Sequence, residues 1–247
     1  MAFLDGLFGN RSSLLEAEIK DEKKEEDDEV EDQVRRQMFV QLEVVANELS
    51  YEQFMKKFNS MGGIVEVFID GDEKATPSVQ CRIGPTGKID IISTHDQIMG
   101  GRDNQVFLGG SFPANIEYNV EIGKLTLKIA EILKEKNVLG RFGVDFLSVK
   151  TNDKWEHYAI EINLRKGGTT HPFLMLQFLT DGRYNTEDGK YYTSKGHLVR
   201  YYFCSDNLKS DKYKGLSPHD LIDIAMVNDL HYDGTSQEGV MFHLIGA

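Results

Sequence analysis

The sequence predicts an α+β fold with a mostly antiparallel sheet and packed helices, and three patterns support this prediction. Residues 143–149 and 158–163 are apolar runs separated by a short polar segment, which is typical of a hairpin. Residues 78–83 and 88–92 are joined by Gly-Pro-Thr-Gly, a sequence suited to a tight turn. Residues 119–136 repeat apolar side chains at helical spacing, which predicts a helix with one face packed on the strands.

The composition limits the function classes. The chain has 247 residues, 40% of them hydrophobic, and a formal net charge of −12. The run from Glu16 to Asp32 holds eleven acidic residues and three lysines, so it accounts for −8 of that charge. The remainder is nearly balanced, which argues against nucleic acid as a partner. Two cysteines, Cys81 and Cys204, are too few for a disulfide framework and predict reduced thiols.

The start of the chain lacks a basic segment followed by a long apolar core, the pattern of a secretory signal. No apolar run approaches the roughly 20 residues that span a bilayer, so we expect a cytoplasmic protein without a membrane partner. The composition changes near Met38. This divides the chain into a charged, flexible N-terminal segment, 1–37, and a folded domain, 38–247. A tether for an unknown partner protein is the alternative role for the acidic run.

Alternation, capping residues and glycine stops predict the other elements. The predicted strands are 39–45, 64–69, 198–203 and 240–245, and the further helices begin at Ser50, at Thr169 or Thr170, and at Ser217. Residues 94–110, rich in glycine and polar side chains, are expected to form a long functional loop.

Two groups of polar residues have open interpretations. His95 and Asp96 could form an acid/base pair, although neighbours in sequence need not be in contact. Ser78, Gln80 and Arg82 share one face of their predicted strand. That face is either the solvated side of a sheet or the wall of a cleft.

The predicted hairpin of 143–163 sets two carboxylates against each other. Its apolar face pairs Val144 with Ile162 and Phe146 with Ile160, if the hairpin is centred on Asp153. On the opposite face Asp145 then meets Glu161, with Asn163 two residues further on. Like charges across a strand pair are destabilising unless a cation lies between them. Carboxylate and amide oxygens are ligands that magnesium prefers, whereas a register shifted by one residue would leave both carboxylates merely solvated.

These residues and the loop after them resemble the second half of an ATP-grasp active site. The resemblance rests on Asp145, Glu161-Ile162-Asn163, Arg165 and Gly167-Gly168. A second match, Glu66 to Glu73, resembles the hinge that binds adenine in these enzymes. Ser93-Thr94-His95-Asp96-Gln97 and the stretch from Glu161 to Phe173 narrow the resemblance. They are similar to the branch that includes the ATP-grasp region of IQ motif-containing protein H and is related to bacterial peptide ligases.

The resemblance, which covers 38–247, implies an ATP-dependent carboxylate–amine ligase that acts through an acyl phosphate. It implies ATP and Mg²⁺ as cofactors, and small-molecule or peptide carboxylates and amines as substrates. The implied metal ligands are Asp145, Glu161 and Asn163. The implied nucleotide contacts are the main chain of Glu66, Val67 and Phe68, the ribose-binding Glu73, and Lys166. The implied catalytic residues are Arg165, Arg82 and His95.

The resemblance is also partial. ATP-grasp enzymes carry, ahead of the hinge, a subdomain with lysines and a glycine-rich flap over the phosphates, and a charged run occupies part of that region here. We therefore expect an incomplete ATP-grasp fold. Two alternatives stay open: a catalytically inactive domain that acts as a binding or structural module, and a kinase of the same fold that releases a stable phosphorylated product.

Overall fold

The structure is a computed structural model that describes residues 50–64, 66–100, 106–205, 208 and 210–243. The chain forms two compact units, 1–68 and 69–247, and each is described by itself. The predicted N-terminal segment 1–37, the boundary at Met38 and the predicted strand 39–45 lie outside the described residues.

The described part of the first unit contains one helix, α4 (Tyr51–Met61). Its start is fixed by a capping box, because the Ser50 side chain accepts a hydrogen bond from the Gln53 main-chain N–H and the Gln53 side chain accepts one from Ser50. Gly62 ends the helix with a φ of 73°, a conformation that favours glycine. The predicted helix start at Ser50 is thus confirmed.

In its described residues, the second unit is built on a seven-stranded sheet whose neighbouring strands are antiparallel. Its strands are β1 (Glu73–Ala75), β2 (Pro77–Ile83), β3 (Ile89–Gly100), β4 (Val106–Phe112), β5 (Gly140–Thr151), β6 (Lys154–Asn163) and β9 (Tyr202–Cys204). The order is β1-β5-β2-β3-β4-β9, and β6 pairs with β5. β1 and β2 follow each other along one edge of β5, so β6 takes the other edge. The α+β class and the two predicted hairpins are confirmed.

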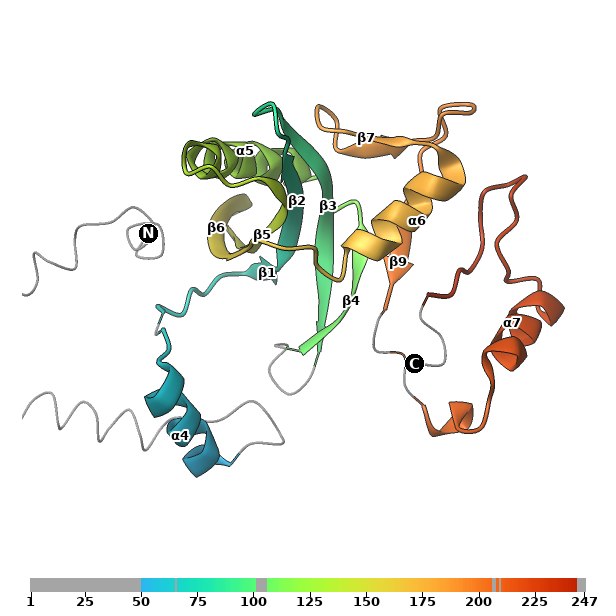
Figure 1. The fold of residues 1–247 in the computed structure, drawn as a ribbon, viewed down its shortest axis with the longest axis horizontal. Coiled ribbons are helices and arrows are strands. Elements are labelled where there is room, and N and C mark those ends of the chain that lie inside the picture. The colour runs from blue at the N-terminus through green and yellow to red at the C-terminus, as the bar shows by residue number, and fades with distance from the viewer. Residues whose placement is uncertain (1–49, 65, 101–105, 206–207, 209, 244–247) are drawn as a thin grey trace, which may run out of the picture. The chain divides into compact units, whose positions relative to one another are not determined.

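Helices cover the sheet, and a small second sheet completes the unit. The helices are α5 (Asn119–Glu135), α6 (Thr170–Thr180) and α7 (Pro218–Val227), with a 3₁₀ turn at Asp211–Tyr213, and β7 (Arg183–Asn185) pairs with β8 (Lys190–Tyr192). In Figure 1, α5 and α6 lie on opposite sides of β2 and β3. Among the helices of the described ranges, none has the length and apolar character needed to cross a bilayer.

Each face of the sheet has its own apolar cluster. The larger cluster joins the buried stripe of α5, including Ile122 and Leu133, to the inward side chains of β2 and β5. The smaller cluster is aromatic and centres on Phe112, Phe173 and Tyr191, so it joins β4, α6 and β8. The polar residues of β2 and β5 discussed below lie on the face opposite the α5 cluster, because side chains alternate along a strand.

The prediction of a long loop at 94–110 is wrong. β3 continues to Gly100, and β4 begins at Val106 and pairs with it. The glycines at 109 and 110 lie inside β4, where a Cβ on Gly109 would fall 2.0 Å from the Cys204 carbonyl oxygen on β9. They mark a close approach between strands and not a break in the sheet.

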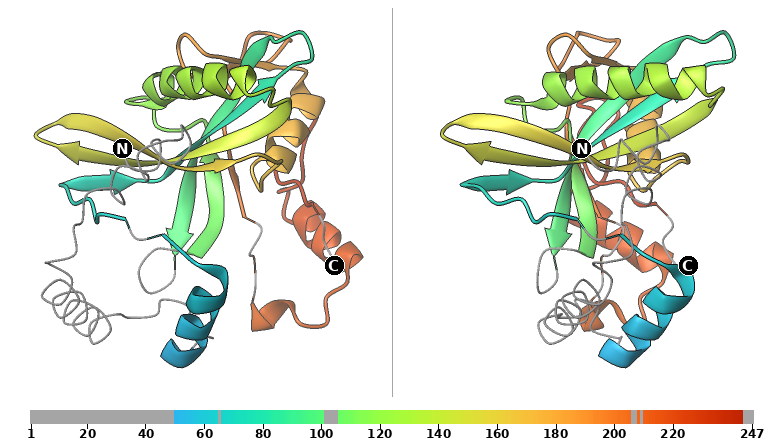
Figure 2. Two further views of the ribbon diagram at one scale, coloured as in Figure 1. Left: turned by 60° about the vertical axis from the view of Figure 1, so that its left-hand side comes forward. Right: turned by 90° about the vertical axis from the view of Figure 1, so that its left-hand side faces the viewer.

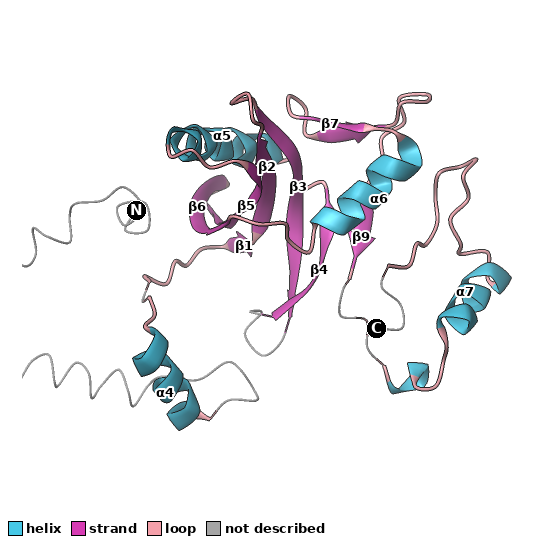
Figure 3. Cartoon of the chain, in the orientation of Figure 1, coloured by secondary structure: helices cyan, strands magenta, loops and turns pink. Residues whose placement is uncertain are grey.

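Three predicted strands also differ from the structure. None of the described residues of 64–69 is in a strand. Val199 forms only an isolated bridge to Tyr192, so β9 starts at Tyr202 and not at 198. Val240 forms only an isolated bridge to His231, and Figure 3 shows loop over 240–243. A β-branched run forms a strand only where a neighbouring strand accepts its hydrogen bonds, and sequence pattern does not reveal that neighbour.

Candidate active site

The hairpin β5–β6 carries the predicted metal ligands, and its turn end projects beyond β2 and β3 (Figure 2). The two turn residues, Asn152 and Asp153, have φ values of 51° and 60°. Positive φ at both positions gives a tight turn whose twist matches the strands. Next to the turn, Thr151 pairs with Lys154, so the hairpin is centred between Asn152 and Asp153.

A β-bulge then shifts the register by one residue. Phe146 pairs with Ala159, whereas Asp145 pairs with Glu161, so Ile160 is the unpaired residue. The prediction that Phe146 meets Ile160 is therefore wrong. The predicted pairs of Val144 with Ile162 and Asp145 with Glu161 are confirmed, because the bulge restores the register beyond Ile160.

The two carboxylates share one face at the end of this hairpin. Asp145 is half-buried and Glu161 is exposed. Asn163 is in the same row, and its Nδ2 donates a hydrogen bond of 3.0 Å to Asp145 Oδ2. The structure thus brings together the three predicted metal ligands, from β5 and β6.

Neighbouring strands supply further partners of Asp145. Ser78 pairs directly with it across β2 and donates a hydrogen bond, and Gln97 of β3 donates another. Burial raises the pKa of Asp145, and the Glu161 carboxylate raises it further. The hydrogen bonds from Ser78 and Gln97 and the charge of Arg165 oppose that rise, because they stabilise the ionised form.

The donor set fits a hard divalent cation. Two carboxylates and one amide oxygen are oxygen ligands of the kind that bind Mg²⁺ together with substrate phosphates and water. Placing two acids directly across a strand pair is otherwise unfavourable. Within the described ranges, no group of three or more His, Cys, Asp or Glu side chains could hold a metal ion, so Asn163 or a substrate would have to complete the coordination.

The glycine-rich loop after β6 leads from these ligands into α6. Arg165 and Lys166 are exposed in it, and Arg165 Nη1 donates to the Lys166 carbonyl oxygen at 3.2 Å. Thr169 occupies the N-cap position, but no side-chain capping bond forms there. Thr170 Oγ1 instead accepts from the Gly167 N–H at 3.2 Å. The predicted helix is confirmed, and the threonine hydroxyl stabilises the loop ahead of it.

His95 lies in a different environment from the one predicted. It sits on β3, fully buried, with its Nε2 2.8 Å from the Tyr202 hydroxyl oxygen. Its ring contacts the rings of Phe112 and Phe173. Burial lowers the pKa of His95 to about 3, so the ring is neutral. Its surroundings are those of a core residue of the aromatic cluster.

Asp96 does not join His95, because adjacent strand residues point to opposite faces. The Asp96 carboxylate accepts hydrogen bonds from the Tyr118 hydroxyl at 2.6 Å and from the Asn115 N–H at 2.7 Å. The predicted acid/base pair is therefore not formed.

Arg82 lies on the carboxylate face but at the far end of β2. It is four residues from Ser78, a separation of about 13 Å along a strand. It is exposed and pairs across the strands with Arg141, whose pKa is lowered by burial and by the charge of Arg82. Two adjacent arginines form a positive site that is separate from the metal ligands.

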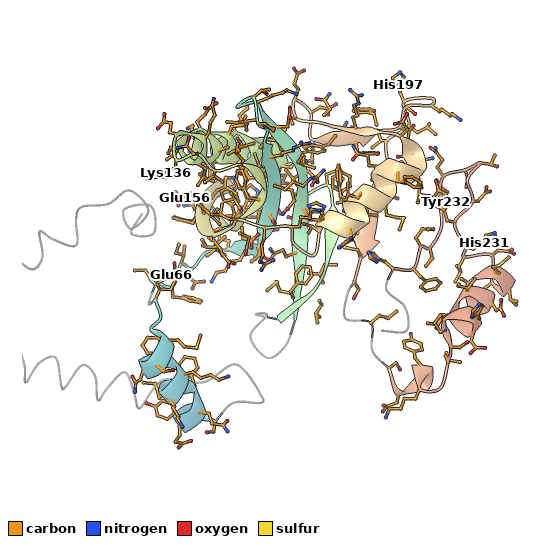
Figure 4. The ribbon with its side chains drawn as sticks, in the orientation of Figure 1. Glu66, Lys136, Glu156, His197, His231 and Tyr232 are labelled. Atoms are coloured by element: carbon orange, nitrogen blue, oxygen red, sulfur yellow. The ribbon has the colours of Figure 1, made fainter. Side chains whose placement is uncertain are left out.

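The predicted nucleotide contacts at the hinge fall in both units. Glu66, Val67 and Phe68 are exposed in the segment after α4. Figure 4 labels Glu66 in this segment. Glu73 belongs to β1, where it pairs with Lys150 of β5. The Lys150 ammonium donates to Glu117, ahead of α5, so Glu73 and Asp145 lie on opposite faces of the sheet.

Sequence reasoning missed Gln97 and Arg141 as neighbours of the candidate site and left Ser78 undecided. A signal for Ser78 exists, because it shares the polar face of Gln80 and Arg82. Gln97 belongs to the stretch Ser93–Gln97 that carries the resemblance, but the predicted loop did not place it beside Asp145. Arg141 becomes visible only through the pairing of β5 with β2.

The chain is similar in sequence to one family of known proteins and to an individual ligase. A family model described as "IQCH-like, ATP-grasp" matches residues 20–187. The chain is also 29% identical over 199 residues to an L-propargylglycine--L-glutamate ligase from Streptantibioticus cattleyicolor. The match covers 81% of this chain and 39% of the ligase, so the chain spans about two fifths of that relative.

Solved structures give weaker matches. A biotin carboxylase from Campylobacter jejuni in complex with β-γ-ATP is 18% identical, with a TM-score of 0.40 over 51% of this chain and 27% of that chain. A putative ATP-grasp superfamily protein from Archaeoglobus fulgidus is 20% identical, with a TM-score of 0.35 over 55% of this chain and 45% of that chain.

Proposed function

This chain belongs to the IQCH-like ATP-grasp family, and from that premise we propose that it binds Mg-ATP and joins a carboxylate to an amine. ATP phosphorylates the carboxylate, ADP leaves, and the amine displaces phosphate from the acyl phosphate to form an amide. Amino acids are the substrate class that we propose, because the named relative is a ligase of L-propargylglycine and L-glutamate.

One observation carries the proposal: Asp145 and Glu161 face each other across β5 and β6, with Asn163 bonded to Asp145. The family match spans this hairpin. A pair of facing acids that costs stability without a cation is the arrangement expected of a metal site.

Each residue of the site has a proposed role. Asp145, Glu161 and Asn163 hold Mg²⁺, which when bound neutralises phosphate charge and aligns the phosphates for transfer. Arg165 is proposed to bind the substrate carboxylate, because it is close enough to stabilise the charge of Asp145, and Lys166 offers a second charge in the same loop.

The nucleotide end of the site is proposed from the family pattern. Main-chain groups of Glu66, Val67 and Phe68 bind adenine. Glu73 is not assigned to the ribose of the same nucleotide, because it lies on the face of the sheet opposite Asp145. Arg82 pairs with Arg141 at the far end of β2, separate from the metal ligands, so Arg165 and not Arg82 is assigned to the carboxylate that is phosphorylated. His95, buried and neutral, supports the sheet beneath the site.

The test is the variant Glu161→Gln, measured as ADP release that needs Mg²⁺, L-glutamate and a second amino acid. Turnover is expected to fall by about 100-fold or more, because an uncharged amide replaces a charge-bearing ligand. The matched control is Glu156→Gln, an exposed glutamate of the same strand near the turn (Figure 4). Equal turnover in Glu161→Gln and the unchanged chain would contradict the proposal.

Calorimetry with Mg-ATP separates this proposal from the non-enzymatic alternative. A ligase binds Mg-ATP and sustains repeated turnover to ADP when the carboxylate and the amine are both present. Binding without any ADP release would instead favour a domain that acts as a binding module, and a stable phosphorylated product without an amide would favour a kinase.

A further inference from the structure

Donor side chains on three other strands act on the Asp145 carboxylate. Asn163 of β6 donates a hydrogen bond of 3.0 Å, and the Ser78 hydroxyl of β2 and the Gln97 amide of β3 lower its pKa as hydrogen-bond donors. Of these three, Ser78 stands directly opposite Asp145 in the register, and it is 2% exposed. A short, buried side chain at a paired position has little freedom to move, so it can fix the direction of the carboxylate.

Gln80 orients the hydroxyl of Ser78. The Nε2 of Gln80 donates to Ser78 Oγ at 3.2 Å. A serine hydroxyl has one proton to donate, and an amide N–H occupies one of its lone pairs here. The Ser78 proton is therefore directed toward Asp145, which as a carboxylate only accepts. Gln80, Ser78 and Asp145 form a chain of donors that runs in one direction.

Gly143 makes room for this chain. It pairs with Gln80 across β2 and β5, and a Cβ added to it would lie 2.8 Å from Gln80 Nε2. Any larger residue would displace the amide from its position over the strand. A glycine two pairs away from the metal ligand, on the same face, thus belongs to the same arrangement.

From this geometry we infer that Ser78, oriented by Gln80, is the positioning residue that holds Asp145 for a divalent cation. The inference rests on the proposed function, since it requires that Asp145 binds metal. Partners that orient a metal ligand contribute about 10- to 100-fold to metal affinity in known sites. Ser78 touches neither the cation nor substrate, and it acts only through Asp145.

The experiment is Mn²⁺ titration of the full chain, followed by electron paramagnetic resonance of the free ion. Mn²⁺ accepts the same oxygen ligands as Mg²⁺. Ser78→Ala is expected to raise the Mn²⁺ dissociation constant by about tenfold or more. Ser78→Thr, which keeps the hydroxyl, is expected to restore most of the affinity.

The matched control is Ser148→Ala. Ser148 is also fully buried in the same sheet, three residues from Asp145, but its hydroxyl lies 2.7 Å from His157 Nδ1 on the opposite face. Its removal tests the loss of a buried serine without touching Asp145. Unchanged Mn²⁺ affinity is expected for this variant, even where its melting temperature falls.

The outcomes separate the inference from the proposed function. If the unchanged chain binds no Mn²⁺, both fail. If it binds Mn²⁺ and folded Ser78→Ala binds equally well, the inference alone fails. Should Ser78→Ala not fold, Gln80→Met removes the orienting donor at a half-buried position. Weaker Mn²⁺ binding by Gln80→Met would support the inference, and unchanged binding would overturn it.

Discussion

His95 and Asp145 lie on the same face of the sheet, and both pair with Ser78. Their surroundings differ sharply. Aromatic rings enclose His95, whereas Asp145 receives three hydrogen bonds from neutral side chains. Burial opposes charge in both residues, but only Asp145 has groups that favour its ionised form. Their neighbours therefore keep His95 neutral and make Asp145 a carboxylate suited to binding a cation.

The buried His95 predicts a pH-dependent stability. Its pKa is lowered from 6.5 to about 3 in the folded chain, so between those values the unfolded state binds a proton that the folded state does not. The contribution of neutral His95 to the free energy of unfolding is therefore fully present above the unfolded pKa. As the pH falls below that pKa, the free energy of unfolding decreases by up to about 1.4 kcal/mol per pH unit.

Urea unfolding of the full chain from pH 7 to pH 4.5 checks this prediction. His95→Gln should show a flatter dependence on pH than the unchanged chain, because the titrating group is gone. Parallel curves for His95→Gln and the unchanged chain would contradict the assignment.

At the scale of elements, the tight turn of the β5–β6 hairpin gives a second prediction. Asp153 has a φ of 60°, which is strained for a β-branched residue. Asp153→Val is expected to lower the free energy of unfolding by about 1–2 kcal/mol. Asp153→Gly should not, because glycine adopts this conformation without strain. Thermal melts of the three proteins decide it, and equal stability of the valine variant would refute the assigned turn.

The elements also show how much the sequence could predict. The hairpin of 143–163 is readable because Val144 and Ile162 alternate with Asp145 and Glu161. The bulge cannot be predicted from the sequence. Ile160 lies inside an apolar run, and any residue of that run could be the unpaired one. Only the completed sheet, in which β5 must also pair with β2, identifies which one it is.

The continuation of β3 beyond residue 92 and the strand β4 were not predicted, for a different reason. Their polar residues suggested a loop, yet Thr94 bonds to Tyr184 at 2.9 Å and His95 bonds to Tyr202 at 2.8 Å. These partners lie 90 and 107 residues away in the chain. Such distant partners form the hydrogen bonds that buried polar groups need, and a local sequence pattern does not reveal these partners.

At the scale of the whole molecule, the division at residue 68 predicts where a protease acts first. Phe68 is 82% exposed in a segment without strand or helix, at the end of the first compact unit. Brief digestion with chymotrypsin should therefore yield a fragment that begins at Ile69, because cleavage needs accessible, irregular chain.

Mass spectrometry of the early products checks this prediction. Phe68→Ala should remove that fragment. Phe112, only 1% exposed within β4, serves as the internal control and should stay uncut over the same time. Early cleavage inside the sheet, at a rate equal to that at Phe68, would be inconsistent with a compact second unit.

The bulge at Ile160 gives this hairpin one residue more than its pairing requires. A chain that lacked Ile160 would pair Ala159 and Glu161 in unbroken succession, and Asp145 would still face Glu161. β5 has no unpaired residue to lose. A deletion in β5 between Asp145 and the turn would therefore increase the difference in length between the two paired strands. Length variation among relatives should therefore fall on the β6 side, and a single gap there is compatible with a preserved pair of acids.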